Sequence, residues 1–355
     1  MGQNLPKNNL MRKELNLAKN IVFSNFNSSF FPYKLTLAVT YKCNSKCHLC
    51  HIWEKDSEKE IGLGEIKKFF QKNNRFNWVD LTGGEPFLRM DLVNICKTII
   101  TNCPNLYLLH IPTNGLLPQK IEKNIKDILK FKPHNFIISV ALDGPPLLHD
   151  KLRGIKGNYP RAVETYKRLK KIKEKNFEVF FGMTLSGYNY NFIEKTYQSL
   201  RKEIKNLERN DLHFNIAHHS FYYRNLKINL GLNKKITLNL RSFIEKREKK
   251  FSGVQFLESK YQSLIPKYLK TGRSPLSCQA LKASLFIDPY GDVYPCTLWN
   301  KKITNLKDIN YDLKNIWLSD KVKNLRKQIV NDKCCGCWTP CEAYQTILGN
   351  LSKAF

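Results

Sequence analysis

Cys43-Asn44-Ser45-Lys46-Cys47-His48-Leu49-Cys50 is the most informative segment of the chain, and it directly follows an apolar, β-type run over residues 35–41. Its three cysteines are separated by three residues and then by two. So short a segment offers three thiolates to one metal centre, but it does not easily offer a fourth. An iron–sulfur cluster held by three thiolates keeps one iron open for a small molecule. The segment therefore predicts chemistry at an iron–sulfur cluster.

The alternatives for this segment are a structural zinc site and a set of buried free thiols. Structural zinc usually takes four ligands arranged as two close pairs. No second pair lies near residues 43–50. The spacing therefore favours an iron–sulfur cluster over both alternatives.

The composition is that of a folded protein whose cysteines stay reduced. The chain has 355 residues, of which 42% are hydrophobic, and this is enough for one large domain and a small one. Residues 1–20 are polar and lack the apolar core of a signal peptide, and no apolar run is long enough for a transmembrane helix. We therefore expect a cytoplasmic protein whose 11 cysteines serve metal rather than disulfides.

The chain is strongly basic, with a formal net charge of +29. Such a charge suits nucleic acid, an anionic membrane surface or an acidic substrate. However, the basic runs at residues 167–175 and 246–250 resemble solvated helix surfaces and lack the interleaved aromatic residues of a single-strand-binding groove. We therefore do not expect a nucleic-acid partner, and contact with a membrane surface stays open.

From residue 35 the sequence alternates between strand-like and helix-like segments. Strand candidates span 35–40, 78–81, 106–111, 136–142, 178–185 and 212–217, and helix candidates span 64–72, 92–101, 120–131, 161–175 and 192–205. This alternation predicts an α/β fold with a parallel sheet. Six units are too few for a closed eight-stranded barrel, so we expect a partial (β/α)6 TIM-like barrel. Chemistry in such folds lies at the carboxyl ends of the strands, where residues 43–50 are found.

The other segments complete a division into five parts. Residues 1–34 form an N-terminal extension with a helix-like stretch, and residues 35–233 form the barrel core. Residues 234–274 form a helical linker, residues 275–345 a small cysteine-rich domain, and residues 346–355 a tail. Within the cysteine-rich domain, residues 283–288 and 292–296 predict a hairpin, because Pro289-Tyr290-Gly291 between them favours a turn.

A second motif, Thr82-Gly83-Gly84-Glu85-Pro86, ends the second predicted strand. The two glycines let the backbone come close to a ligand. The Glu85 carboxylate, together with free carbonyl groups, suits an ammonium group. Placed one strand–helix unit after the cysteine segment, this motif resembles the radical S-adenosylmethionine (radical SAM) superfamily, and the resemblance covers roughly residues 35–220.

The resemblance implies an enzyme in which Cys43, Cys47 and Cys50 hold a 4Fe-4S cluster. The open iron of that cluster binds the amino and carboxylate groups of S-adenosylmethionine. One electron, from a donor such as a flavodoxin or ferredoxin, then cleaves S-adenosylmethionine to a 5'-deoxyadenosyl radical. This radical removes a hydrogen atom from an unactivated C–H bond of the substrate.

The resemblance also implies a set of residues that bind S-adenosylmethionine. These are Gly83, Gly84 and Glu85 for the methionine amino group, Asn114 facing the site, Ser139 and Asp143 for ribose or carboxylate, and Arg153 for the methionine carboxylate. The alternative roles for Asn114, Ser139 and Arg153 are hydrogen bonding at a strand end or a charge on a helix surface. Leu49 departs from the pattern, since an aromatic residue that packs on adenine often stands there.

The C-terminal domain holds six of the cysteines. Seventeen residues separate Cys278 from Cys296, and Gly291 stands five residues before Cys296. This spacing resembles the auxiliary-cluster domains called SPASM and twitch. A full SPASM domain has seven cysteines for two clusters, so six imply one auxiliary 4Fe-4S cluster. The implied ligands are Cys278, Cys296 and Cys337 with Cys334 or Cys341, whereas Cys335 is spare; a four-cysteine zinc ribbon is the alternative.

An auxiliary cluster implies that the enzyme, of the oxidoreductase type, carries out a net oxidation or forms a cross-link. Such a reaction needs a base, and His218 and His219 at the end of the sixth strand are the candidates. A redox-neutral epimerase or mutase is one alternative. A basic metal-binding module that binds nucleic acid without redox chemistry is an alternative of another class. The substrate stays open among small molecules, lipids and peptides. Residues 1–34 are too short for the peptide-binding domain of many SPASM enzymes, which favours a small molecule, a sugar, a lipid precursor or a protein target recognised elsewhere.

Overall fold

The computed structural model describes residues 7–26, 31–248 and 252–354, and its centre is a nine-stranded sheet with the order β6-β5-β4-β3-β2-β1-β7-β8-β9. The strands are β1 Lys34–Ala38, β2 Trp78–Thr82, β3 Leu108–Thr113, β4 Asn135–Ala141, β5 Phe177–Leu185, β6 Leu212–Ile216, β7 Ser284–Ile287, β8 Asp292–Tyr294 and β9 Thr304–Asn305. Neighbours from β6 through β7 pair in parallel, whereas β8 and β9 pair antiparallel. The predicted partial barrel of six parallel strands, with a C-terminal extension, is confirmed.

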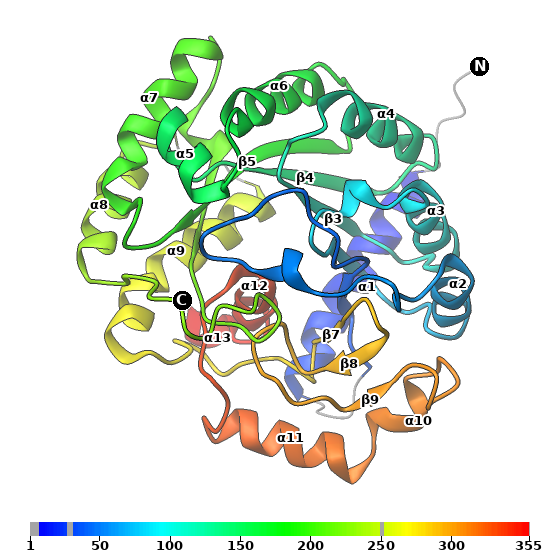
Figure 1. Ribbon diagram of the computed structural model, residues 1–355. Coiled ribbons are helices and arrows are strands. Elements are labelled where there is room, and N and C mark those ends of the chain that lie inside the picture. The colour runs from blue at the N-terminus through cyan, green and yellow to red at the C-terminus, as the bar shows by residue number, and fades with distance from the viewer. Residues whose placement is uncertain (1–6, 27–30, 249–251, 355) are drawn as a thin grey trace.

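Helices surround the curved sheet (Figure 1). They are α1 Lys7–Phe26, α2 Leu63–Lys72, α3 Leu92–Asn102, α4 Pro118–Leu129, α5 Pro146–Arg153, α6 Asn158–Lys170, α7 Ile193–Glu203, α8 Lys235–Ile244, α9 Gly253–Thr271, α10 Lys314–Trp317, α11 Asp320–Val330, α12 Pro340–Leu348 and α13 Leu351–Ala354. Helices α2, α3, α4, α6 and α7 lie around the outside of the parallel strands (Figure 1). Within the described ranges, no helix is long and apolar enough to cross a membrane.

Strands β2 and β3 alternate between apolar residues under the helices and residues that face the barrel interior, among them Asp80 and His110. In β3, Leu109 and Ile111 belong to the buried apolar core, whereas His110 between them is partly exposed. In β2, Val79 and Leu81 belong to the same core and Asp80 lies on the opposite face. Successive side chains of a strand point to opposite faces. The helices therefore cover an apolar surface, and the interior keeps a polar one.

The cysteine-rich segment continues the main sheet. β7 pairs in parallel with β1, with Leu35 opposite Leu285, and β8 follows β7 as the predicted hairpin. Gly291 has a φ of 81° in the hairpin turn, a left-handed conformation that glycine adopts readily. The pairing of β1 with β7 was not predicted, because contact between two segments far apart in the chain leaves no local pattern.

A buried lysine, Lys34, links β1 to β2 and α12. Its Nζ lies 3.0 Å from Asp80 Oδ2, and it donates to the Cys341 carbonyl oxygen (2.6 Å) and to Gln345 Oε1 (3.0 Å). A buried charge is tolerated only when it is paired and hydrogen-bonded. Although burial raises the pKa of Asp80, the charge of Lys34 and the hydrogen bond from His110 hold it well below its usual range.

We expect Lys34→Met to lower the free energy of unfolding of the iron-free protein by roughly 3–5 kcal/mol, because Asp80 would be buried without its counter-charge. Urea unfolding followed by circular dichroism measures the loss. The double variant Lys34→Met/Asp80→Asn removes both charges and should recover much of the stability. Equal losses in the single and the double variant would show that the ion pair is not responsible.

Candidate functional site

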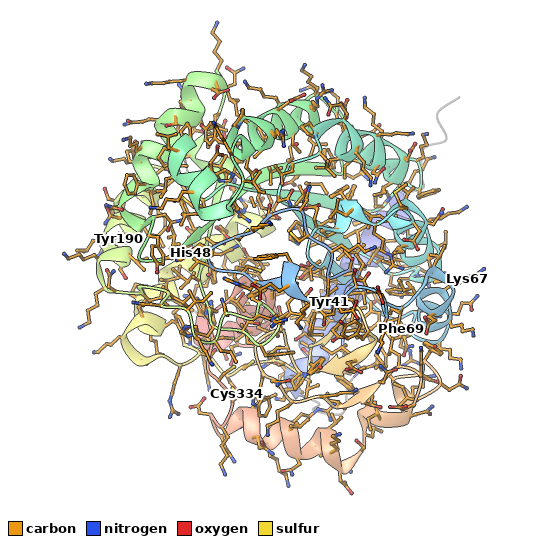
Figure 2. The ribbon with its side chains drawn as sticks, viewed as in Figure 1. Tyr41, His48, Lys67, Phe69, Tyr190 and Cys334 are labelled. Atoms are coloured by element: carbon orange, nitrogen blue, oxygen red, sulfur yellow. The ribbon has the colours of Figure 1, made fainter. Side chains whose placement is uncertain are left out.

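The cysteine segment lies in the loop that follows β1, at the carboxyl ends of the parallel strands, as predicted. The loop of residues 39–51 crosses the centre of Figure 1 in blue, and Tyr41 and His48 mark it in Figure 2. We call it the cysteine loop. Four segments form hydrogen bonds with the cysteine loop: the turn after β2, the end of β3, the end of α5 and the loop after β6.

The turn after β2 packs against the cysteine loop, backbone to backbone. The Gly84 N–H donates to the Thr40 carbonyl oxygen (2.7 Å), and the Glu85 N–H donates to the Lys42 carbonyl oxygen (2.8 Å). A Cβ at Gly84 would lie 2.3 Å from the Lys42 oxygen, and a Cβ at Gly83 would lie 2.5 Å from the Thr40 oxygen. A side chain does not fit at these distances. The two glycines thus allow the turn to approach the cysteine loop itself, whereas the sequence had suggested only a close approach to a ligand.

The buried Glu85 side chain joins this turn to the end of β3. Its Oε1 accepts from Thr113 Oγ1 (2.9 Å), and its Oε2 accepts from the Asn114 N–H (2.7 Å). The Asn114 side chain donates to Asn44 Oδ1 in the cysteine loop (2.7 Å). Burial raises the pKa of Glu85 to about 7. Thr113 and Asn44 were not predicted, and their only sequence signal is their position at a strand end and between the cysteines.

The carboxyl end of α5 holds the opposite side of the cysteine loop. The Lys46 N–H donates to the Arg153 carbonyl oxygen (3.1 Å), and the His48 N–H donates to the Leu152 carbonyl oxygen (2.8 Å). Gly154 has a left-handed φ of 66°, and a Cβ there would lie 2.2 Å from the Lys46 oxygen. Helix α5 was not predicted. The glycine at its carboxyl end allows the backbone of the cysteine loop to lie in close contact with it.

Arg153 places a guanidinium beside one of the cysteines. Its Nη1 lies 3.7 Å from Cys47 Sγ, and its Nε forms an ion pair with Asp143 Oδ2 at 2.8 Å. Asp143 Oδ1 also accepts from the Thr184 N–H (2.8 Å). The structure thus brings Arg153 and Asp143 together next to the cysteine loop. Their contact with S-adenosylmethionine stays a prediction, as does that of Glu85 and Asn114.

The loop after β6 covers the end of the cysteine loop. The His51 N–H donates to the Tyr223 carbonyl oxygen (2.8 Å), and Asn225 Nδ2 donates to the Leu49 carbonyl oxygen (2.9 Å). Tyr222, from the same loop, is fully buried in a cluster against which the first and third cysteines pack. Asn225 carried no sequence signal, because its role depends on a contact with a distant segment.

The thiols of the cysteine loop lie in surroundings that disfavour bare thiolates. Burial, and then the charge of Cys47, raise the pKa of Cys50 to about 12, and burial raises the pKa of Cys43 to about 12. Iron would supply the positive charge that three thiolates need. No three His, Cys, Asp or Glu side chains of the described residues are arranged to hold a single metal ion. We therefore expect Cys43, Cys47 and Cys50 to hold a cluster of several irons rather than a single ion, and this ligation stays a prediction.

Ser139 lies on the inner face of β4, away from the cysteine loop. Its Oγ lies 2.9 Å from His110 Nε2, and His110 in turn faces Asp80. The structure therefore groups Ser139 with residues of the barrel interior. Contact between Ser139 and ribose stays a prediction.

The two histidines that were predicted as bases differ in their surroundings. The Nδ1 of His218 donates to the Ile216 carbonyl oxygen (2.7 Å), and its Nε2 accepts from the Trp338 N–H (2.9 Å). Burial lowers the pKa of His218 to about 4. Because the backbone occupies both ring nitrogens, His218 is a structural residue and does not fit the role of a base. His219 is exposed, and its Nε2 donates to the Ile228 carbonyl oxygen (2.8 Å), so its role stays a prediction.

Five of the six C-terminal cysteines lie close enough for the charge of one to affect the pKa of another, and we call them the group of five cysteines. Burial raises the pKa of Cys337 well above its usual value, and the charges of Cys278, Cys296 and Cys335 add to this effect. Cys334, labelled in Figure 2, contributes to the raised pKa of Cys278. The group is therefore assembled from both sides of the β7–β8 hairpin and from the segment between α11 and α12. Cys335, which was predicted to be spare, lies within this group.

Cys341 has different neighbours. It lies in the first turn of α12, and after the effect of burial the charges that most affect its pKa are those of Lys34 and Asp80. Both of these residues belong to the barrel interior. Of the two candidates for a fourth auxiliary ligand, Cys334 thus affects the pKa of Cys278, whereas Cys341 responds mainly to Lys34 and Asp80; which of them binds iron stays a prediction.

We expect Gly84→Ala to lower the iron content of the reconstituted protein, because its methyl group would lie 2.3 Å from the Lys42 oxygen and displace the cysteine loop. Iron and sulfide per chain measure the loss. Gly64→Ala is the matched control, since nothing lies within 4 Å of a Cβ there and alanine favours a helix. Full iron content in Gly84→Ala would show that the loop does not depend on this contact.

We expect Cys341→Ser to keep the auxiliary iron and Cys337→Ser to lose it, because only Cys337 lies within the group of five cysteines. The measurement is iron per chain in a background in which Cys43, Cys47 and Cys50 are all alanine, so that only auxiliary iron remains. Loss of iron in Cys341→Ser together with retention in Cys334→Ser would reverse the assignment.

Two family models match the chain. The radical SAM superfamily matches residues 37–200, and the iron–sulfur cluster-binding domain SPASM matches residues 278–338. The first range contains the cysteine loop and the turn after β2. The second contains the group of five cysteines and ends before Cys341. The expected cofactors, 4Fe-4S clusters and S-adenosylmethionine, are those of the matched families.

Two curated relatives come from Bacillus subtilis (strain 168). The antilisterial bacteriocin subtilosin biosynthesis protein AlbA is 23% identical over 290 residues, which are 80% of this chain and 59% of AlbA. The sporulation killing factor maturation protein SkfB is 29% identical over 167 residues, which are 45% of this chain and 38% of SkfB. The chain thus spans less than two thirds of the length of either relative.

Solved structures share the fold at low sequence identity. Native anSMEcpe with bound AdoMet has a TM-score of 0.60 at 17% identity and covers 90% of this chain and 98% of its own. Streptococcus suis SuiB bound to the precursor peptide SuiA has a TM-score of 0.60 at 18% identity and covers 95% of this chain and 78% of its own. The two family matches lead to one conclusion: residues 37–200 form a radical SAM superfamily domain, and residues 278–338 form a C-terminal SPASM domain.

Proposed function

We propose that this chain is a radical SAM enzyme of the oxidoreductase type that forms a cross-link or another oxidised product in a peptide. When bound, the cluster and S-adenosylmethionine supply a 5'-deoxyadenosyl radical, which removes a hydrogen atom from the substrate. The observation that carries this proposal is the cysteine loop, which places three thiols at the carboxyl ends of the strands and is clamped on several sides. Cys43, Cys47 and Cys50 would hold the cluster.

Two charged side chains beside the loop suit a ligand that has both an ammonium and a carboxylate group. Glu85 offers a buried carboxyl, whose pKa burial raises to about 7. Arg153 offers a guanidinium, which now contacts Cys47 and Asp143. Charge-assisted hydrogen bonds of this kind fix orientation as well as affinity. We assign Glu85 to the amino group and Arg153 to the carboxylate group of S-adenosylmethionine.

The second cysteine group supports a net oxidation. Removal of a hydrogen atom leaves a carbon radical, which becomes a closed-shell product by losing one electron and one proton. Cys278, Cys296 and Cys337, with Cys334 or Cys335, would hold an iron–sulfur cluster that supplies an acceptor for the electron. The proton requires a base in the barrel interior.

A peptide is the substrate class that the relatives support. AlbA is named for bacteriocin biosynthesis, SkfB for maturation of a killing factor, and SuiB was solved with a precursor peptide. The N-terminal helix α1 docks on the barrel through Asn16 and Asn20, which both contact Asn77. We therefore expect the barrel and the C-terminal segment to recognise the peptide. We further propose a cytoplasmic location and a flavodoxin or ferredoxin as the electron donor.

A redox-neutral reaction is the second candidate, and the position of Cys341 favours it. This cysteine lies apart from the other five, near Lys34 and Asp80 of the barrel interior. A thiol in this position would suit return of a hydrogen atom to a substrate radical. The product would then have the mass of the substrate, and it would gain deuterium in D2O.

After anaerobic reconstitution, we expect about eight irons per chain and release of 5'-deoxyadenosine from S-adenosylmethionine and dithionite. The variant Cys43→Ala/Cys47→Ala/Cys50→Ala should keep about four irons and release no 5'-deoxyadenosine, because it loses only the first cluster. Iron analysis and chromatography with mass detection measure both quantities. Iron-loaded wild-type protein that releases no 5'-deoxyadenosine would refute the proposed function.

A further inference from the structure

Four consecutive strands each direct one polar side chain into the barrel interior, and the four side chains are joined. Lys34 Nζ on β1 lies 3.0 Å from Asp80 Oδ2 on β2. Asp80 Oδ1 lies 3.3 Å from His110 Nδ1 on β3. His110 Nε2 lies 2.9 Å from Ser139 Oγ on β4. An acid, an imidazole and a hydroxyl group are thus placed in sequence across three strands.

The charges determine the direction of these hydrogen bonds. Lys34 and His110 outweigh burial and hold the pKa of Asp80 well below its usual range, so Asp80 is an ionised acceptor. His110 therefore carries its proton on Nδ1 and presents the lone pair of Nε2 to Ser139. Ser139 donates its hydroxyl proton to that lone pair. A hydroxyl next to a base that a third group orients is the arrangement that activates a serine.

The surroundings of Ser139 leave room for a bound group. The His110 side chain is 25% exposed, whereas the Lys34 side chain is fully buried. Gly182 on β5 has no side chain, and a Cβ there would lie 3.9 Å from Ser139 Cβ. Of the four linked side chains, those near Ser139 are therefore accessible to solvent, whereas Lys34 at the other end is not.

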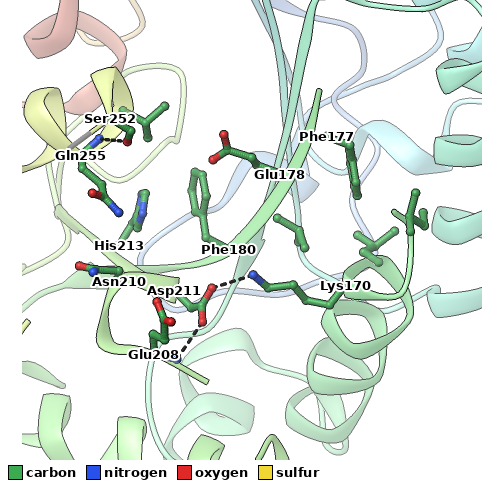
Figure 3. A pocket seen from close by; sticks show the side chains of 14 residues that line it. Lys170, Phe177, Glu178, Phe180, Glu208, Asn210, Asp211, His213, Ser252 and Gln255 are labelled. Carbon is green, nitrogen blue, oxygen red and sulfur yellow. Dashed lines mark hydrogen bonds and ion pairs between the residues drawn. The ribbon is translucent and has the colours of Figure 1, made fainter. Parts of the chain in front are cut away.

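A polar cavity lies one strand further along the sheet. Phe180 stands opposite Ser139 in the β4–β5 register and stacks on His213, with 3.8 Å between the ring centroids. Both rings line a cavity of about 260 Å³, together with polar side chains that include Glu178 and Asn210 (Figure 3). The cavity thus reaches the strand next to Ser139, although Ser139 itself is not among the residues that line it.

We propose that Asp80, His110 and Ser139 form a proton relay in the barrel interior. Ser139 Oγ takes a proton from a bound group while its own hydroxyl proton passes to His110 Nε2, and Asp80 stabilises the imidazolium that forms. This role rests on the proposed function: the proton is the one that the substrate radical loses when its electron passes to the auxiliary iron–sulfur cluster. Ser139 is the catalytic residue, and His110 and Asp80 are positioning residues. The relay takes the place of His218 as the base.

Phenylmethylsulfonyl fluoride tests the relay in the reconstituted protein without a substrate. Ser139 Oγ attacks the sulfonyl sulfur, fluoride leaves, and the hydroxyl proton passes to His110 Nε2. We expect one sulfonyl group per chain on Ser139, by intact mass and peptide mapping, and none on the exposed Ser263. His110→Ala should slow the modification by about 100-fold or more. Added imidazole should restore part of the rate, which it would not do if His110 were only structural.

His134→Gln is the matched control, because the His134 ring packs at a tilt against Tyr107, outside the relay. Its rate of modification should equal that of the wild type. His110→Gln is a second variant that keeps the volume of the side chain, and circular dichroism confirms that each variant is folded. Failure to modify Ser139 in folded wild-type protein would overturn the relay. An unchanged rate in both His110 variants would overturn it as well.

These outcomes are independent of the radical chemistry. Release of 5'-deoxyadenosine from S-adenosylmethionine and dithionite is measured separately and requires the cysteine loop. Unmodified Ser139 with normal release would remove the relay and leave the proposed function. Modification of Ser139 without release of 5'-deoxyadenosine would support the relay and refute the proposed function.

Discussion

The candidate site depends on the contact between the turn of residues 83–85 and the cysteine loop. Parallel neighbours in a sheet lie about 4.8 Å apart, so the segments that leave β1 and β2 must pass each other closely. Gly83 and Gly84 permit this approach, and two backbone hydrogen bonds then hold the loop. On the far side Gly154 permits the same approach for the end of α5. The positions of all three cysteines follow from this clamp.

The second constraint is the pairing of β7 with β1. It extends the parallel sheet beyond the barrel and attaches the cysteine-rich segment to the strand that precedes the cysteine loop. Helix α12 is then held by Lys34, whose charge is also the partner of Asp80. The two cysteine groups are therefore connected through one sheet. Lys34 on β1 links α12 of the cysteine-rich segment to Asp80 in the barrel interior.

Much of the architecture could be predicted from the sequence. The six barrel strands begin and end within two residues of their expected positions, because apolar runs and turn residues are local signals. The role of His218 could not be predicted. At the end of β6 it resembles a base, yet the Trp338 N–H, more than a hundred residues away, occupies its second ring nitrogen. Asp80 and His110 appeared to be ordinary strand residues, because only the strand order brings them together with Ser139.

The sequence by itself determined the six barrel strands, the cysteine spacing, the turn after β2 and the family resemblance, since each of these is a property of residues close together in the chain. The tertiary structure alone decided which side chains meet. It joined Glu85 to Asn114, grouped five of the C-terminal cysteines apart from Cys341, and aligned Asp80, His110 and Ser139. These contacts depend on sheet order and register, and those are set by the packing of the whole chain rather than by any single segment.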